Sequence, residues 1–154
     1  MLDGEQREFV EARRTATLVT TSRSGLPRPV PICFVLGEPD RESGPTALYS
    51  PLDEKRKSSA DVRALARVRD IAARPSVTLL FERWSEDWSR LAWLRARGSA
   101  LLLEPGDGIG RHRWAVEALR NKYPQYRTHR IETSPMIRVV IDEVASWSAA
   151  TGRI

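Results

Sequence analysis

The chain has 154 residues, with 25 Lys plus Arg against 20 Asp plus Glu, a formal net charge of +5 and a pI of about 10.0. This length, with 41% hydrophobic and 29% charged residues, predicts one soluble globular domain over residues 1–154. No apolar run approaches the ~20 residues of a transmembrane helix. The N-terminus lacks a basic segment followed by an apolar stretch, so we expect neither a membrane span nor a secretory signal.

The first half of the chain predicts a helix, three strands and a second helix, in that order. Residues 3–14 form the first helix, with Asp3 as its cap and Gln6 at the capping-box position. Strands are predicted at residues 16–21, 30–36 and 46–50, where β-branched and apolar residues lie between turn signals. Prolines 27, 29 and 31 lack backbone donors, which places the second strand at a sheet edge or a bulge. The second helix spans residues 59–73, with an apolar stripe formed by Val62, Leu65, Val68 and Ile71.

The second half alternates strands with one further helix. A strand is predicted at residues 77–81, followed by a loop at 83–89 that contains two tryptophans. Residues 90–103 form a longer strand in which Gly98 suggests a bend or bulge. A helix at 110–122 and a last strand at 136–144 complete the pattern, and Trp147 follows. Six short strands and three helices predict a mainly β, α+β fold, in which a mostly antiparallel sheet closes into a barrel with helices outside.

Cysteine and histidine are scarce, which limits metal and thiol chemistry. Cys33 is the only cysteine, so the chain has no intrachain disulfide, and this favours the cytoplasm. We interpret Cys33 as a buried, inert thiol because it lies in an apolar run, and a Cys–His nucleophile pair is the alternative. With His112 and His129 as the only histidines, no zinc site is expected. The basic balance favours anionic partners in general, whether nucleic acid, nucleotides or phosphorylated cofactors.

Lysine is concentrated in one short segment. The chain contains only three lysines, and Lys55 and Lys57 stand two positions apart, where an extended backbone points both side chains to one face. Two neighbouring ammonium groups are suited to a phosphate, and a helix start predicted directly after them adds N–H donors for the same anion. The alternative is a solvated, charged turn before a helix.

Known catalytic motifs are absent from the sequence. It contains no Gly-x-Ser-x-Gly, no Walker A motif and no Gly-x-Gly-x-x-Gly. The adjacent acids Glu86 and Asp87 are better explained as a solvated turn, since neighbouring residues rarely face each other. We therefore assign no catalytic residue and no metal ligand. Either the chain binds without catalysis, or a cofactor carries the chemistry.

Several segments, taken in order, resemble one known family. They are residues 25–31 (GLPRPVP), 52–57 (LDEKRK), 65–77 (LARVRDIAARPSV), 87–95 (DWSRLAWLR), 122–126 (KYPQY) and the closing Trp147. Together these segments resemble the pyridoxamine 5′-phosphate oxidase-like split barrels, and within them the actinobacterial branch that uses the deazaflavin coenzyme F420. The resemblance implies a six-stranded antiparallel split barrel of the FMN-binding type, which forms a homodimer with cofactor sites at the interface.

The resemblance also implies the roles of individual residues. The strand at 30–34 would lie against the cofactor ring, Lys55 and Lys57 would hold the phosphate, and the tryptophan loop of the partner chain would cover the ring. In the family helix an Asn usually stands where this chain has Asp70, and an acid there would repel a phosphate unless it pairs with Arg67 or Arg74. The cofactor-binding residues implied in this way are Val30, Pro31, Ile32, Ser50, Leu52, Asp53, Lys55, Lys57, Arg63, Trp88 and Trp93.

Four functions are consistent with the sequence. The first is an F420-dependent oxidoreductase that transfers a hydride to or from a small conjugated organic substrate, and the second is an FMN-dependent oxidoreductase of the same fold. The third is a non-catalytic cofactor carrier or haem-related binding protein. A nucleic-acid-binding domain ranks last, because no recognisable motif of that class is present, so neither nucleic acid nor membrane is expected as a partner.

Overall fold

A computed structural model describes residues 1–37, 46–52, 61–106 and 109–154 of the chain. The helices are α1 (Gly4–Glu11), α2 (Ala66–Ala73) and α3 (Arg111–Lys122). The strands are β1 (Ala16–Thr21), β2 (Pro27–Ile32), β3 (Val35–Leu36), β4 (Ala47–Pro51), β5 (Ser76–Arg83), β6 (Ala92–Leu103) and β7 (Met136–Ser148). Short 3₁₀ turns are η1 (Val62–Ala64), η2 (Trp88–Arg90), η3 (Pro124–Arg127) and η4 (Ile131–Thr133).

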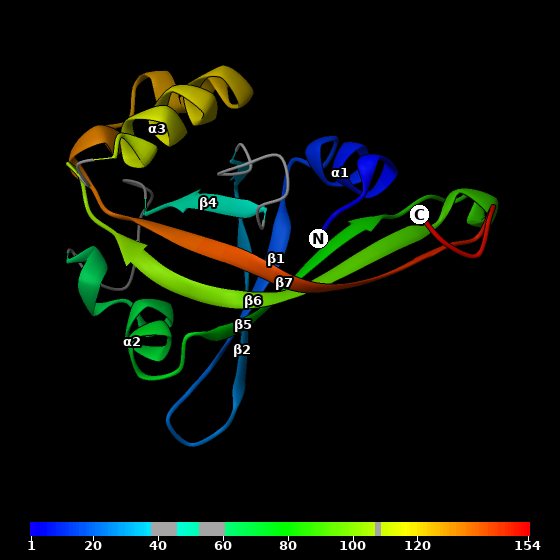
Figure 1. Ribbon diagram of the computed structural model, residues 1–154, viewed down its shortest axis with the longest axis horizontal. Helices are drawn as coiled ribbons and strands as arrows, with labels where there is room; N and C mark the ends of the chain where they lie inside the picture. The colour runs from blue at the N-terminus through cyan, green and yellow to red at the C-terminus, as the bar shows by residue number, and fades with distance from the viewer. Residues whose placement is uncertain (38–45, 53–60, 107–108) are drawn as a thin grey trace.

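The strands form one antiparallel sheet in the order β2-β1-β5-β6-β7-β4-β3. Figure 1 shows that this sheet is strongly curled, with α2 and α3 at different sides of it. The predicted fold, an antiparallel split barrel with flanking helices, is therefore confirmed. The strand predicted at residues 30–36 is in fact two strands, because pairing stops at Cys33 and Phe34, so the sheet has seven strands rather than six.

Two hydrophobic clusters hold the helices to the sheet. The first fills the curl and includes residues from α1 and α2, such as Phe9 and Ile71, packed against strand residues such as Leu18 and Leu94. The second lies between α3 and the neighbouring strands, with Leu119 and Met136 fully buried. Both faces of β4 are thereby covered, which explains why all of its residues are buried.

The start of α1 agrees with the sequence prediction, whereas the start of α2 does not. Asp3 and Gln6 form the predicted capping box at the start of α1. The second helix begins at Ala66 rather than at residue 59, because Leu65 has an extended backbone that separates α2 from η1. Within the described residues, Asp61 caps η1 by accepting a hydrogen bond from the Arg63 N–H.

Strands β6 and β7 form the longest pairing in the sheet, and Gly98 bends it. A register shift occurs at Arg97/Gly98, as the sequence predicted. A side chain at Gly98 would collide with the carbonyl oxygen of Val140, so only glycine allows this close approach. Beyond the bend, β6 and β7 extend as a ribbon toward the C-terminus, away from α2 (Figure 1). No helix in the described part of the chain is long and apolar enough to cross a membrane.

Candidate functional site

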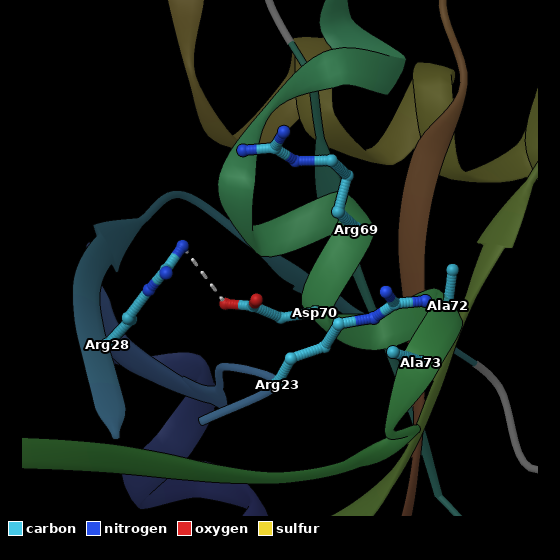
Figure 2. Close-up of a pocket in the computed structure, with 6 residues that line it drawn as sticks. All are labelled: Arg23, Arg28, Arg69, Asp70, Ala72 and Ala73. Atoms are coloured by element: carbon cyan, nitrogen blue, oxygen red, sulfur yellow. Dashed lines mark ion pairs between the residues drawn. The ribbon is translucent and has the colours of Figure 1, made fainter. Parts of the chain in front are cut away.

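An arginine-rich pocket lies between α2 and the hairpin that joins β1 to β2. Its volume is about 520 Å³, and it is lined by Arg23, Arg28, Arg69, Asp70, Ala72 and Ala73. Figure 2 shows Arg28 reaching toward Asp70 from β2, while Arg69 projects from α2 and Arg23 from the hairpin turn. We call this feature the arginine pocket.

The carboxylate of Asp70 is buried at the wall of the arginine pocket. Its side chain is only 7% exposed, and its Oδ2 accepts a hydrogen bond of 3.0 Å from the hydroxyl of Thr20. The Arg28 Nη1 atom lies 3.7 Å from the same oxygen. The expected pairing of Asp70 with Arg67 or Arg74 is therefore wrong, because Asp70 points from α2 toward the hairpin rather than along the helix surface.

Local structure in the hairpin places these partners side by side. Strands β1 and β2 pair so that Thr20 lies directly opposite Arg28, where side chains of an antiparallel pair are neighbours. The turn is closed by Gly25, whose φ of 87° suits glycine and whose N–H donates to the Ser22 carbonyl. Arg74 Nη2 donates to the carbonyl of Arg23 at 3.1 Å, which ties the end of α2 to the same turn.

The donor set of the arginine pocket fits an anionic group. A guanidinium presents five N–H donors in a planar fork that matches the oxygens of a phosphate or a carboxylate. Three such groups around one pocket, with one of them held by Asp70, can bind and orient a phosphate-bearing molecule. Among the described residues, no group of three or more His, Cys, Asp or Glu side chains is arranged to hold a metal ion.

The predicted ring-binding residues of β2 lie on the strand that carries Arg28. Arg28, Val30 and Ile32 alternate on one face of the strand, and their side chains pass from exposed through half-buried to buried. Pro31 is exposed on the other face at the free edge of the sheet. This position agrees with the predicted edge strand, because a proline cannot donate a hydrogen bond to a further strand.

The curl of the sheet brings part of β4 toward the same core as β2. Leu52 and Ile32 belong to one hydrophobic cluster, and Val30 packs against it, although β2 and β4 are five places apart in the strand order. Ser50 is buried and lies on the same face of its strand as Leu48. Ser50 and Leu52 are thus interior residues of the described fold rather than residues of the open pocket.

Of the remaining predicted site residues, some lie outside the part of the chain that the structure describes, and Arg63 does not line the arginine pocket. Asp53, Lys55 and Lys57 lie outside the described residues. Arg63 is exposed, and its Nη2 forms an ion pair of 2.7 Å with Glu104, which raises the pKa of Arg63 through this hydrogen bond and charge.

The two tryptophans predicted for the site lie at the end of the ribbon formed by β6 and β7, Trp88 in the turn η2 and Trp93 on β6. Trp88 is 74% exposed, while Trp93 is half-buried and lines a hollow of about 180 Å³ with Trp84, Leu91 and Trp147. Figure 1 places this end of the ribbon far from α2. Within one chain, therefore, these tryptophans do not reach the arginine pocket.

Sequence reasoning did not single out Arg23, Arg28 or Arg69 as site residues. Arg28 was within reach of such reasoning, because it alternates with Val30 and Ile32 along a predicted strand. Arg23 and Arg69 carry no comparable signal, since an arginine in a turn or on a helix is most often solvated. Their convergence depends on how α2 lies against the hairpin.

A curled antiparallel sheet with a basic pocket at its edge defines the class of this protein as a split barrel. The sequence model of the family described as Pyridoxamine 5′-phosphate oxidase matches residues 2–148, and the chain belongs to this family. A comparison with curated protein sequences finds no significant match.

Solved structures with the same fold come from several bacteria. The conserved hypothetical protein Rv2991 from Mycobacterium tuberculosis is 18% identical, with a TM-score of 0.69 over 97% of this chain and 86% of that chain. A FAD-binding protein from Mesorhizobium loti is 16% identical, with a TM-score of 0.63 over 94% and 92% of the two chains. HutZ, a heme storage protein from Vibrio cholerae, is 13% identical, with a TM-score of 0.62 over 96% and 94%. At these identities the likeness concerns the fold alone.

Proposed function

We propose that this protein is an F420-dependent oxidoreductase that transfers a hydride between the deazaflavin and a small conjugated organic substrate. The observation that carries the proposal is the arginine pocket, because its lining residue Arg28 belongs to β2, the strand that the family resemblance assigns to the cofactor ring. A phosphate in this pocket would anchor a cofactor whose ring extends along β2 toward Val30 and Pro31.

The residues of this chain bind and orient the cofactor, and none of them is required as an acid or a base. Arg23, Arg28 and Arg69 supply donors to the anionic group. Pro31 offers an exposed apolar surface at the sheet edge, against which a planar ring can stack, while the partly exposed Val30 lies on the face of β2 that carries Arg28. When bound, the deazaflavin itself supplies the hydride chemistry.

A homodimer would complete this site. The exposed indole of Trp88 and the half-buried indole of Trp93 belong to the end of the ribbon that lies away from α2, so they do not cover a ring bound at the arginine pocket of their own chain. We propose that the ribbon of a partner chain brings its tryptophans over the ring, since such amphipathic side chains suit an interface. Trp88→Ser with Trp84→Ser is expected to shift the protein toward monomer in sedimentation experiments, and an unchanged dimer would contradict this arrangement.

The second candidate is an FMN-dependent oxidoreductase of the same fold. The arginine pocket could equally accept the phosphate of FMN, and a FAD-binding protein shares the fold. A third candidate, haem-related binding, is suggested by the fold shared with HutZ. It is less well supported, because His112 is buried and its Nε2 lies 2.8 Å from the Ser134 carbonyl oxygen, which leaves that nitrogen engaged.

The proposal is tested by titrating the purified protein with F420 and, separately, with FMN. Quenching of the cofactor fluorescence reports binding. Tight F420 binding with weak FMN binding is expected, followed by turnover of a conjugated substrate with reduced F420. The reverse preference would move the protein to the flavin candidate, and binding of neither would refute both.

Two charge-removing variants locate the phosphate. Lys55→Ala with Lys57→Ala, and Arg23→Ala with Arg28→Ala, should each weaken cofactor binding by roughly 2–4 kcal/mol, since charged hydrogen bonds contribute ~1.5–3 kcal/mol each. Arg7→Ala, which removes an arginine paired with Glu11 on α1, serves as the control and should bind normally. Unchanged affinity in either double variant would remove that pair from the phosphate site.

A further inference from the structure

The arginine pocket contains one feature that an anion site would not need for affinity. Three guanidinium groups attract an anion, yet the carboxylate of Asp70 stands in the wall among them. This carboxylate cannot turn away, because it is buried and its Oδ2 accepts the hydrogen bond from Thr20. Its charge therefore acts on any anion that enters the pocket and contacts Arg28.

The repulsion from a fixed carboxylate grows with the charge of the ligand. Coulomb energy is proportional to the product of the two charges, so a doubly charged anion at a given position is repelled twice as strongly as a singly charged one. Arg28 offsets part of this repulsion, but its side chain is about half exposed and its attraction is shared with solvent. Burial leaves the carboxylate less screened than the guanidinium.

We propose that Asp70 is a specificity-determining residue that shifts the selectivity of the arginine pocket away from a doubly charged phosphate monoester and toward a singly charged phosphodiester. This inference rests on the proposed function, because it supposes that the cofactor phosphate occupies the pocket. It also bears on the choice between the two cofactors. F420 carries its phosphorus as a phosphodiester, whereas FMN carries a monoester that is largely doubly charged above its second pKa of about 6.

A purely structural role for Asp70 makes a different prediction. If the carboxylate only holds Arg28 in place, its removal should weaken the binding of both kinds of anion. If it acts on the ligand charge, a neutral replacement should strengthen the binding of both, and the doubly charged anion should gain more.

The test compares methyl phosphate with dimethyl phosphate at about pH 8 and low ionic strength, with dissociation constants measured by calorimetry or NMR titration. In Asp70→Asn we expect affinity to rise about tenfold per ligand charge, the order given by Coulomb interaction at partly screened contact distances. The affinity for dimethyl phosphate should thus rise about tenfold and that for methyl phosphate about a hundredfold. Asp70→Ser is measured in parallel, so that the result does not depend on one variant folding.

Asp70→Glu is the matched control, because it keeps the charge and should leave the ratio of the two affinities within about twofold of the wild-type ratio. Equal gains for both ligands, or a loss of both, in the neutral variants would overturn the inference. Titration of the same variants with F420 and FMN separates it from the proposed function. A shift in the simple-phosphate ratio without binding of either cofactor would leave the charge selection standing and refute the cofactor assignment.

Discussion

Two charged side chains, the buried Asp70 and the half-buried Lys122, are accommodated in opposite ways. Asp70 receives a hydroxyl hydrogen bond from Thr20 and lies 3.7 Å from the guanidinium of Arg28. Lys122 instead lies over an aromatic face, with its Nζ 4.0 Å from the ring centroid of Phe34. The first charge has a partner of opposite sign, whereas the second is held by the weaker attraction of a ring.

The surroundings of Lys122 change how firmly its proton is held. Burial, followed by the nearby positive charge of Arg14, lowers the pKa of Lys122 to about 8 despite the attraction of the ring. Next to it, burial raises the pKa of Tyr123 to about 12, and its hydroxyl accepts the Phe34 N–H at 3.1 Å. Partial burial on an aromatic face thus leaves a lysine whose pKa, about 8, lies well below its ordinary value.

The largest expected effect comes from removing the ring beneath Lys122. Phe34 is fully buried, and its ring centroid lies 5.2 Å from that of Phe81. Phe34→Ala should lower the free energy of unfolding by about 3–5 kcal/mol, through lost burial and the cavity that remains. Urea denaturation measures this change. Phe34→Leu, which retains most of the volume, should cost much less, and equal losses would show that the site is not tightly packed.

Removing the Thr20 hydroxyl, which donates a hydrogen bond to Asp70, should have a smaller effect on stability. Thr20→Val keeps the shape of the side chain but leaves the buried carboxylate without this donor, which should cost about 1–3 kcal/mol of unfolding free energy. Thr17→Val, on the opposite face of the same strand, is the control and should cost less. If both variants have equal stability in urea, the hydrogen bond to Asp70 contributes nothing.

The smallest expected effect is a pH dependence of the free energy of unfolding, caused by the lowered pKa of Lys122. Its pKa of about 8 in the folded chain lies below the ordinary value of 10.5, so between these values the unfolded chain binds a proton that the folded chain does not. The free energy of unfolding should therefore rise as pH increases from about 8 to 10, by on the order of 1 kcal/mol after allowance for solvent exposure.

Lys122→Met isolates this contribution, because it keeps an unbranched side chain without the charge. The rise with pH in the wild type, relative to this variant, should be visible in urea titrations. The measurement should stop at pH 10, since Tyr123 acts in the opposite direction above its ordinary pKa of 10.0. Parallel curves for the two proteins would mean that Lys122 keeps an ordinary pKa in the folded chain.

Patterns with a short range in sequence were predicted well. The capping box of Asp3 and Gln6, the strand at residues 16–21 and the bend at Gly98 all appear where they were expected. The last strand runs on to Ser148 and includes Trp147, because pairing with β6 continues beyond the apolar stretch. Each of the confirmed features depends on residues within a few positions of one another, where backbone preference and periodicity are decisive.

The candidate site was only partly predictable from the sequence. Val30 and Pro31 were placed on an edge strand from the proline pattern, and the structure agrees. The partners of Asp70 were not predicted, because Thr20 and Arg28 lie far from it in the sequence and meet it only when α2 packs against the hairpin. Local sequence patterns likewise could not predict how far the ribbon tryptophans lie from the arginine pocket.

The sequence alone determined the fold class, the edge position of β2 and the basic character of the molecule. Hydrophobic periodicity, proline chemistry and charge act locally, so a linear reading recovers them. Only the tertiary structure decided which arginines share a pocket, which side chains contact the carboxylate of Asp70, and that the ammonium group of Lys122 lies on an aromatic ring. Those features depend on contacts between segments that are distant in the chain, and such contacts form only when burial of the common core fixes one packing arrangement.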